Sequence, residues 1–241
     1  NFNYQYHQAS EHLLQAEKIF KKYKNDLALC YLYGTLGDNF YKQMNLSQAE
    51  KFYRKKISIS RKLSIMDSLA NGLCGLAQVS SEKGKIKKAE RYFEKAVKIS
   101  QDKSLFKTLA KIQYCYADFC FNRKNYDKAF KIINRSLSFT DKMEKVDQIM
   151  SGLLKAKLIA LTDQNKATDI LESLTGQVDN IEISAEIYFY LYQYSGKEDY
   201  REKAISLYGE LVDKTSVKSF KHRLEQLVKD QVSENFDVED C

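Results

Sequence analysis

Apolar side chains recur along this chain at steps of three and four residues, which is the spacing of one face of an α-helix. The clearest stripe consists of Cys30, Tyr33, Leu36, Gly37 and Phe40. A short polar break follows each stripe, and a second stripe follows the break, so the pattern predicts helices in antiparallel pairs. The 241 residues include no proline and only nine glycines, so the commonest interruptions of helices are scarce. We expect an all-α fold of about ten helices without a sheet.

The helix pairs repeat with a period of forty residues. Alanine occurs at Ala9, Ala49, Ala89 and Ala129. Its neighbours recur with it, four and seven residues later: Leu13, Tyr53, Phe93 and Ile133, then Ala16, Lys56, Ala96 and Ser136. Small residues let two antiparallel helices approach closely, so that a large residue opposite enters the groove between them. A fixed period of this length in helix-forming sequence is typical of a stacked helical-repeat protein.

We divide residues 1–241 into a single array of such repeats. It consists of a partial repeat or N-terminal cap, three full repeats, two divergent repeats, a capping helix and an acidic tail, placed at 1–22, 26–63, 66–103, 106–143, 145–176, 183–215, 216–236 and 237–241. The divergent repeats have their breaks at Gln164-Asn165 and near Gly196-Lys197. Only eight residues precede Ala9, so we expect the chain to be an excerpt from a longer array with attached domains.

One segment also fits a strand. Tyr188, Tyr190, Tyr192 and Tyr194 alternate strictly, which is the period of a β-strand. The flanking helical pattern and the lack of a second candidate strand favour a helix here.

The repeat resembles the tetratricopeptide repeat over about residues 26–143. The matching positions are Leu36, Gly37, Phe40, Ala49 and Tyr53, and again Leu73, Leu76, Ala77, Gly84, Ala89, Phe93 and Ala96. The resemblance implies a right-handed superhelical solenoid of antiparallel helix pairs that serves as a non-catalytic protein-interaction module. The period of forty is longer than the family's usual repeat of about 34 residues, as in the sub-families similar to kinesin light chain and bacterial regulatory arrays. Arg61, Gln101 and Asp141 replace the family's closing proline, so capping has to end the repeats.

The resemblance also implies a binding surface, because the first helix of each unit lines the concave face of such a solenoid. The equivalent positions give a candidate peptide- or partner-binding set of Tyr31, Asp38, Tyr41, Asn71, Gln78, Lys111, Tyr114, Asp118, Phe121 and Asn122. Asn, Gln, Asp and Tyr without a large apolar stripe suit an extended or helical peptide. The alternative is an ordinary solvated face. The family's carboxylate clamp fails here, because its places hold Gly34, Asp38, Gly75, Lys111 and Cys115.

The sequence offers no catalytic constellation. The three histidines, His7, His12 and His222, lie near the ends and share no motif with a nucleophile, and no phosphate-binding loop, zinc or calcium pattern is present. We therefore expect no enzyme activity, no cofactor and no metal. The five cysteines, Cys30, Cys74, Cys115, Cys120 and Cys241, read as reduced packing residues, which favours a cytoplasmic location. No segment approaches the ~18–20 apolar residues of a membrane span.

The distribution of charge does not point to one class of partner. The net charge is +7, and the residues before the last eight carry +11, but the lysines of 83–98 interleave with glutamates and read as a solvated outer face. Three functions stay open. The first is a scaffold that binds a protein or peptide within a larger signalling or regulatory protein, with self-association possible. The second is a peptide-sensing array that controls an effector domain. The third, nucleic-acid binding, is disfavoured because Asp38, Glu82 and Asp118 lie along the concave face.

Overall fold

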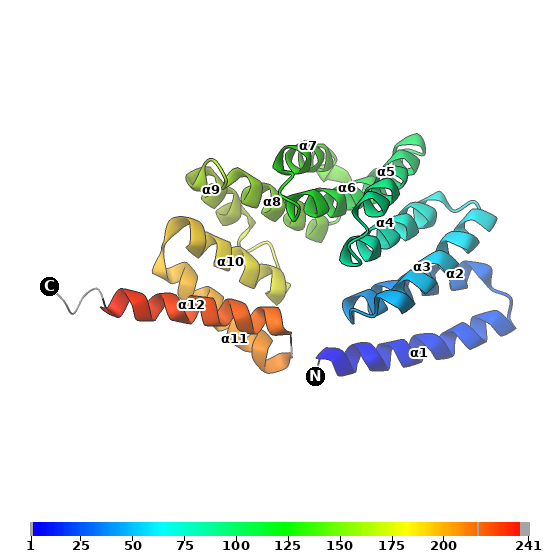
Figure 1. The fold of residues 1–241 in the computed structure, drawn as a ribbon, viewed down its shortest axis with the longest axis horizontal. Helices are drawn as coiled ribbons and strands as arrows, with labels where there is room; N and C mark the ends of the chain where they lie inside the picture. The colour runs from blue at the N-terminus through cyan, green and yellow to red at the C-terminus, as the bar shows by residue number, and fades with distance from the viewer. Residues whose placement is uncertain (1, 216, 237–241) are drawn as a thin grey trace. The chain divides into compact units, whose positions relative to one another are not determined.

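The computed structural model describes residues 2–215 and 217–236, which contain twelve α-helices and one short 3₁₀-helix but no strand (Figure 1). The helices are α1 (Phe2–Lys22), α2 (Asp26–Lys42), α3 (Leu46–Lys62), α4 (Met66–Glu82), α5 (Ile86–Asp102), α6 (Phe106–Phe121), α7 (Tyr126–Leu137), α8 (Lys145–Ile159), α9 (Gln164–Leu174), α10 (Ile181–Ser195), α11 (Glu198–Lys214) and α12 (Lys218–Phe236), and the 3₁₀-helix is η1 (Thr140–Lys142). The all-α fold is confirmed, although the expected number of helices was too low. The acidic tail at 237–241, with Cys241, lies outside the described residues.

The chain forms two compact units, Asn3–Gln148 and the part from Ile149 onward. Each is described by itself.

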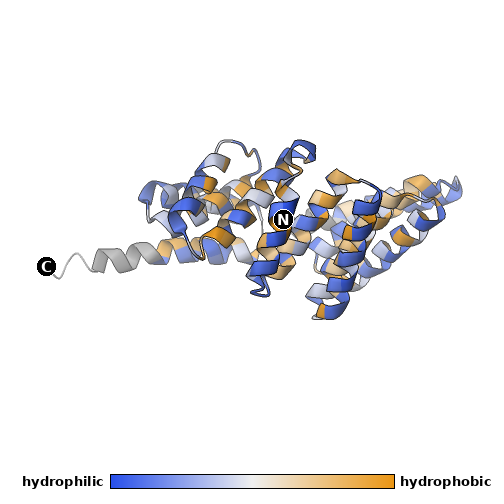
Figure 2. Ribbon diagram, turned by 90° about the horizontal axis from the view of Figure 1, so that it is seen from above, coloured by the Kyte–Doolittle hydropathy of each residue, from blue (hydrophilic) through white to orange (hydrophobic). Residues whose placement is uncertain are grey.

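In the first unit, consecutive helices pack as antiparallel pairs. The pairs are α2 with α3, α4 with α5 and α6 with α7, and α3 contacts α4 as α5 contacts α6. The first helices of successive pairs also touch, α2 on α4 and α4 on α6. Figure 1 shows this succession from blue through green, and Figure 2 shows apolar positions recurring along each helix between polar ones.

The periodic alanines lie where these helices cross. Ala49, Ala89 and Ala129 are fully buried, as are Ala167 and Ala204 in the second unit. Their partners Tyr53, Phe93 and Ile133 are almost fully buried too. The forty-residue pattern therefore marks the interior of the solenoid, as expected from close helix packing.

The same turn ends each helix from α1 to α6, once every twenty residues. A residue with φ between 52° and 69° stands at its centre, in turn Lys24, Met44, Ser64, Gly84, Ser104 and Lys124. After α2, for example, the Met44 amide donates to the Tyr41 carbonyl and the Asn45 amide to the Phe40 carbonyl, both at 2.9 Å. This is the Schellman pattern, which satisfies the last carbonyls of a helix.

The turns explain how the repeats end without proline. At the two inter-repeat turns, Ile65 and Leu105 precede the next helix and provide no side-chain cap. The capping hydrogen bonds there close the end of the preceding helix, from the Ile65 amide to the Ser60 carbonyl at 2.9 Å and from the Leu105 amide to the Ser100 carbonyl at 2.8 Å. Within the first and third pairs, Asn45 and Asn125 do cap the second helix, with side-chain oxygens that accept from the Gln48 and Lys128 amides.

The second unit is built from α8 beyond Gln148 and from α9 to α12, around two apolar clusters. One joins Leu153, Leu171 and Leu191, and the other joins Phe189, Tyr208 and Leu227, with further residues around each. The tyrosines of 188–194 lie in helix α10, so the helical interpretation is confirmed.

Two details of this unit concern the predicted breaks and cap. The break placed at Gln164-Asn165 is wrong, because the Asp163 side chain caps α9 by accepting from the Lys166 amide at 2.9 Å, and Gln164 is already helical. Helix α12 packs on α11, where the buried Arg201 side chain donates from Nε to the Leu227 carbonyl at 2.8 Å.

Candidate functional site

In the first unit, two first helices, α2 and α4, each carry a pair of glycines, and we call the strip along these four glycines the glycine seam. Gly34 and Gly37 lie on α2, and Gly72 and Gly75 lie on α4, three residues apart in each case. A Cβ added at Gly37 would lie 2.6 Å from the ring of Tyr53, and one at Gly75 would lie 2.4 Å from the same ring. The Tyr53 ring, carried by α3, is therefore wedged between the two first helices and requires glycine on both sides.

Tyr53 positions a carboxylate at the end of this seam. Its hydroxyl donates to Asp38 Oδ1 at 2.7 Å. Burial, and then the charge of Asp38, raise the pKa of Tyr53 far above its ordinary value, so the hydroxyl stays protonated as a donor. The exposed Asp38 carboxylate is thereby fixed on the concave side of the unit.

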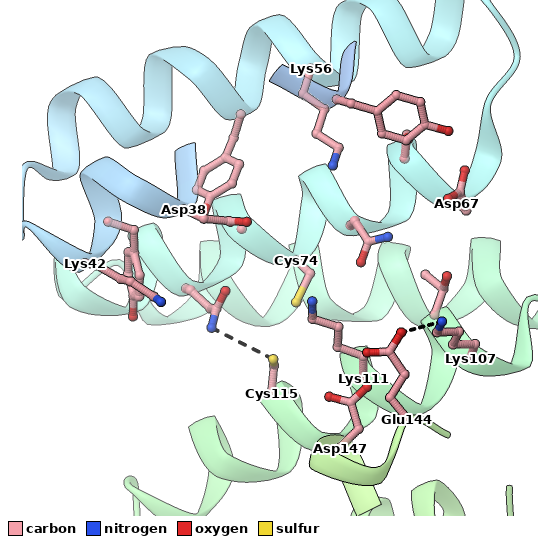
Figure 3. Close-up of a pocket in the computed structure, with 18 residues that line it drawn as sticks. Asp38, Lys42, Lys56, Asp67, Cys74, Lys107, Lys111, Cys115, Glu144 and Asp147 are labelled. Carbon is pink, nitrogen blue, oxygen red and sulfur yellow. Dashed lines mark hydrogen bonds and ion pairs between the residues drawn. The ribbon is translucent and has the colours of Figure 1, made fainter. Parts of the chain in front are cut away.

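The same seam lets a lysine of the outer helix reach the concave side. A Cβ at Gly34 would lie 2.6 Å from Lys56 Nζ, and one at Gly72 would lie 3.6 Å from the Lys56 stem. Lys56 therefore passes over two glycines from α3, and Figure 3 shows its ammonium group directed into the hollow. Among the described residues no carboxylate lies within ion-pair distance of Lys56.

These features line a hollow of about 720 Å³, which we call the first-helix hollow (Figure 3). Its charged lining consists of four lysines and four carboxylates: Lys42, Lys56, Lys107, Lys111, Asp38, Asp67, Glu144 and Asp147. Lys107 and Glu144 form an ion pair across its end. Burial raises the pKa of Asp147, against the opposing effect of the Lys111 charge. Both signs of charge are thus presented side by side.

A smaller hollow of about 370 Å³ adjoins the first, because Tyr41, Gln78 and Cys115 line both. Its further lining includes Asp118 and Asn122, and the Asn122 amide donates to the Asp118 carboxylate at 3.0 Å. The Gln78 amide donates to Cys115 Sγ at 3.9 Å. We call this space the second hollow.

The four described cysteines are free. Cys115 lies against Cys74 where α6 meets α4, and a hydrogen bond between the two thiols, together with burial, raises the pKa of Cys74 well above its ordinary value. Cys74 and Cys115 also line the first-helix hollow, a place that their interpretation as simple packing residues did not foresee.

Eight of the ten expected binding residues line the two hollows. Six of them line the first-helix hollow: Tyr31, Asp38, Tyr41, Asn71, Gln78 and Lys111. Two more, Asp118 and Asn122, line the second hollow. Tyr114 and Phe121 line neither. At about 100° per residue, they lie roughly 60° and 80° around α6 from Lys111, whereas Cys115, Asp118 and Asn122 lie within about 40° of it. Phe121 packs on Tyr126 instead, with ring centroids 5.5 Å apart.

Sequence reasoning missed several lining residues. Glu144 and Asp147 come from the segment after the third repeat, which the periodicity does not align. The repeat assigns Lys56 to the second helix of its pair, whereas only the first helices are expected to line the concave face. Its signal was in the repeat itself, because the equivalent positions hold the small residues Ala16, Ala96 and Ser136.

In the described part of the chain, no group of three or more His, Cys, Asp or Glu side chains is placed to hold a metal ion. None of the described helices is long and apolar enough to cross a membrane.

The fold defines a tetratricopeptide-like helical-repeat protein, and comparison with solved structures agrees with this class. No known family model and no curated protein matches the sequence. Three solved structures share the architecture. BtubC (BKLC) from P. vanneervenii is 20% identical, with a TM-score of 0.62, over 92% of this chain and 91% of its own. The apo form of RapI is 13% identical, with a TM-score of 0.67, over 99% and 97%. The pilF protein of Pseudomonas aeruginosa is 17% identical, with a TM-score of 0.60, over 89% and 99%. At these identities the likeness establishes the fold alone.

Proposed function

We propose that this protein is a non-catalytic scaffold that holds a peptide or a helix of a partner protein in the first-helix hollow. The observation that carries the proposal is the hollow itself, a concave space of about 720 Å³ with four lysines and four carboxylates around it. Sites that bind ligands are concave and combine surface for contact with a few positioned polar groups. Tyr31, 53% exposed at its edge, adds an aromatic side chain of the kind enriched in binding surfaces.

The balance of charge in the hollow favours a protein partner. A polyanion such as a nucleic acid is attracted to surfaces of uniform positive charge. Here the carboxylates of Asp38, Asp67 and Asp147 stand among the lysines and would repel phosphates. A peptide carries charges of both signs and many main-chain hydrogen-bonding groups, so it can complement such a lining.

The free side chains of the hollow identify the residues to test. Lys111 is exposed and has no ion-pair partner among the described residues, and Asn71 is half-buried beside it. Among the described residues, neither side chain forms a hydrogen bond or an ion pair that a partner would have to break, although the Lys111 charge acts on Asp147. In this proposal the chain is part of a larger signalling or regulatory protein in the cytoplasm.

The test is capture of partners from a lysate of the source cells, with bound proteins quantified by mass spectrometry. Lys111→Glu and Asn71→Arg should each lower capture of the specific partner at least tenfold. Lys95→Glu is the matched control, because it makes the same charge change as Lys111→Glu at an exposed outer position that lines neither hollow. Loss of capture with Lys95→Glu, and none with the two hollow variants, would place the partner elsewhere.

A further inference from the structure

A third hollow lies on the outer side of the first unit, between the second helices of two successive pairs. It runs between α5 and α7 over α6, with a volume of about 340 Å³, and we call it the outer groove. Positions 94, 97, 98 and 101 of α5 and positions 128, 131, 132 and 135 of α7 form its walls. Both sets follow the spacing of one helix face, so each wall of the groove is one face of a helix.

The rim of the outer groove is strongly basic. Lys98, Lys131 and Arg135 line it together with one carboxylate, Glu94, and no carboxylate of the described residues lies within ion-pair distance of any of these three cations. Lys128 also lines the groove, but its ammonium group forms an ion pair with Glu90 and lies 5.0 Å from the centroid of the Tyr116 ring. Three positive groups are thus left to face solvent around one space.

The floor of the outer groove contains an unsatisfied buried amide. Gln113 is only 3% exposed, and its Oε1 atom has no hydrogen-bond partner among the described residues. A buried polar atom without a partner is unfavourable, so a ligand that supplies a donor would gain from it. Val97, Ile132 and the Tyr116 ring provide the apolar surface beside it.

We propose that the outer groove binds an acidic segment of another protein, with a Leu, Ile or Phe side chain in the groove between flanking Asp or Glu residues. The apolar side chain contacts Val97 and Ile132, and the flanking carboxylates pair with Lys98, Lys131 and Arg135. The Gln113 side chain, whose Oε1 is buried at the floor, turns toward the groove and accepts from a main-chain N–H of the segment. A volume of about 340 Å³ is at the lower end of the range for small-ligand pockets, which suits one anchoring side chain. This site is separate from the first-helix hollow and does not depend on it.

The preceding repeat shows what makes this groove particular. Forty residues earlier, Leu73 takes the place of Gln113, and Tyr92 takes the place of Ile132. The buried amide and the space for a ligand side chain therefore come from substitutions in the third repeat and not from the repeat pattern. These two substitutions also provide the variants that test the proposal.

The experiment is selection of random dodecapeptides, displayed on phage, against the full chain. We expect enriched peptides that carry Leu, Ile or Phe within four residues of at least two carboxylates. The affinity of one such peptide is then measured by fluorescence anisotropy. The double variant Lys131→Glu/Arg135→Glu should weaken it at least tenfold, and the double variant Lys88→Glu/Lys95→Glu less than twofold. The two variants change the net charge equally.

Two further variants separate binding from folding. Gln113→Leu copies the preceding repeat, so it should raise the midpoint of thermal unfolding while it weakens the peptide. Ile132→Tyr should fill the groove and weaken the peptide without lowering the midpoint. The proposal is wrong if no enriched peptide is acidic, or if both charge-reversed double variants weaken the peptide equally. It is also wrong if Lys111→Glu in the first-helix hollow abolishes binding and Lys131→Glu/Arg135→Glu does not.

Discussion

The wedge formed by Tyr53 makes a quantitative prediction about Gly75. An alanine there would place its Cβ 2.4 Å from Tyr53 Cε1 and 2.5 Å from Tyr53 Cζ. Carbon atoms in ordinary contact are about 3.5–4.0 Å apart, so the ring would have to move by roughly 1 Å. It has little room to do so, because α2 lies close on the other side, where a Cβ built at Gly37 would be 2.6 Å from the ring, and Tyr53 is only 3% exposed.

Two opposing effects set the size of the change. Overpacking in a dense core costs about 1–3 kcal/mol, whereas replacing a helical glycine by alanine gains up to about 1 kcal/mol. Since the ring is confined from both sides, we expect the steric cost to dominate and Gly75→Ala to lose about 1–2 kcal/mol. The shifted ring would also disturb its hydrogen bond to Asp38.

The measurement is urea-induced unfolding followed by circular dichroism at 222 nm, with hydrogen exchange of α2 to α4 to locate the effect. Gly209→Ala in α11 is the control, because no atom lies within 4 Å of the added Cβ. That variant should be as stable as the parent protein or more stable by up to about 1 kcal/mol. If Gly75→Ala behaves like Gly209→Ala, the glycine seam does not hold Tyr53 as described.

Three further predictions concern stability. Ala89→Leu should cost about 1–3 kcal/mol by overpacking, since Ala89 is fully buried, and an unchanged thermal midpoint would contradict the assigned register. Met44→Gly should gain about 0.5–1 kcal/mol in urea unfolding, because Met44 is 62% exposed at a φ of 57° that favours glycine; a loss would show that its side chain matters. Burial raises the pKa of Glu17, but hydrogen bonds from Lys21, Lys55 and Tyr33 outweigh it and lower the pKa from 4.5 to about 2. Glu17 should therefore contribute up to about 3 kcal/mol above pH 4.5, and this contribution should be lost as the pH falls toward 2. Unfolding curves of the parent and of Glu17→Gln against pH should converge over that range, and parallel curves would contradict the assignment.

The sequence predicts the interior of this fold well because burial follows the period of the chain. Ala49, Ala89 and Ala129 repeat every forty residues and are all fully buried where helices cross. The conformation of the turns is harder to predict from the sequence, because side chains such as those of Met44 and Lys124 have no preference for positive φ. Their conformation follows from the length of each helix and the closing hydrogen bonds.

The candidate site was predictable only in part, for a similar reason. Periodicity assigns each residue to a face of its helix, and this places Asn71, Gln78 and Lys111 correctly in one hollow. It does not show how far a long side chain reaches. Lys56 belongs to the outer helix by register, yet its stem crosses the seam at Gly34 to the concave side.

Whether a partner protein binds in the first-helix hollow can be tested by photo-cross-linking. Benzoylphenylalanine is placed at Tyr41, which lines both hollows, and at the exposed outer position Lys95. If the partner binds in the hollow, the protein captured by the parent chain cross-links from position 41 and not from position 95. A cross-link to that protein from position 95, with none from position 41, would show that the partner binds on the outer surface instead.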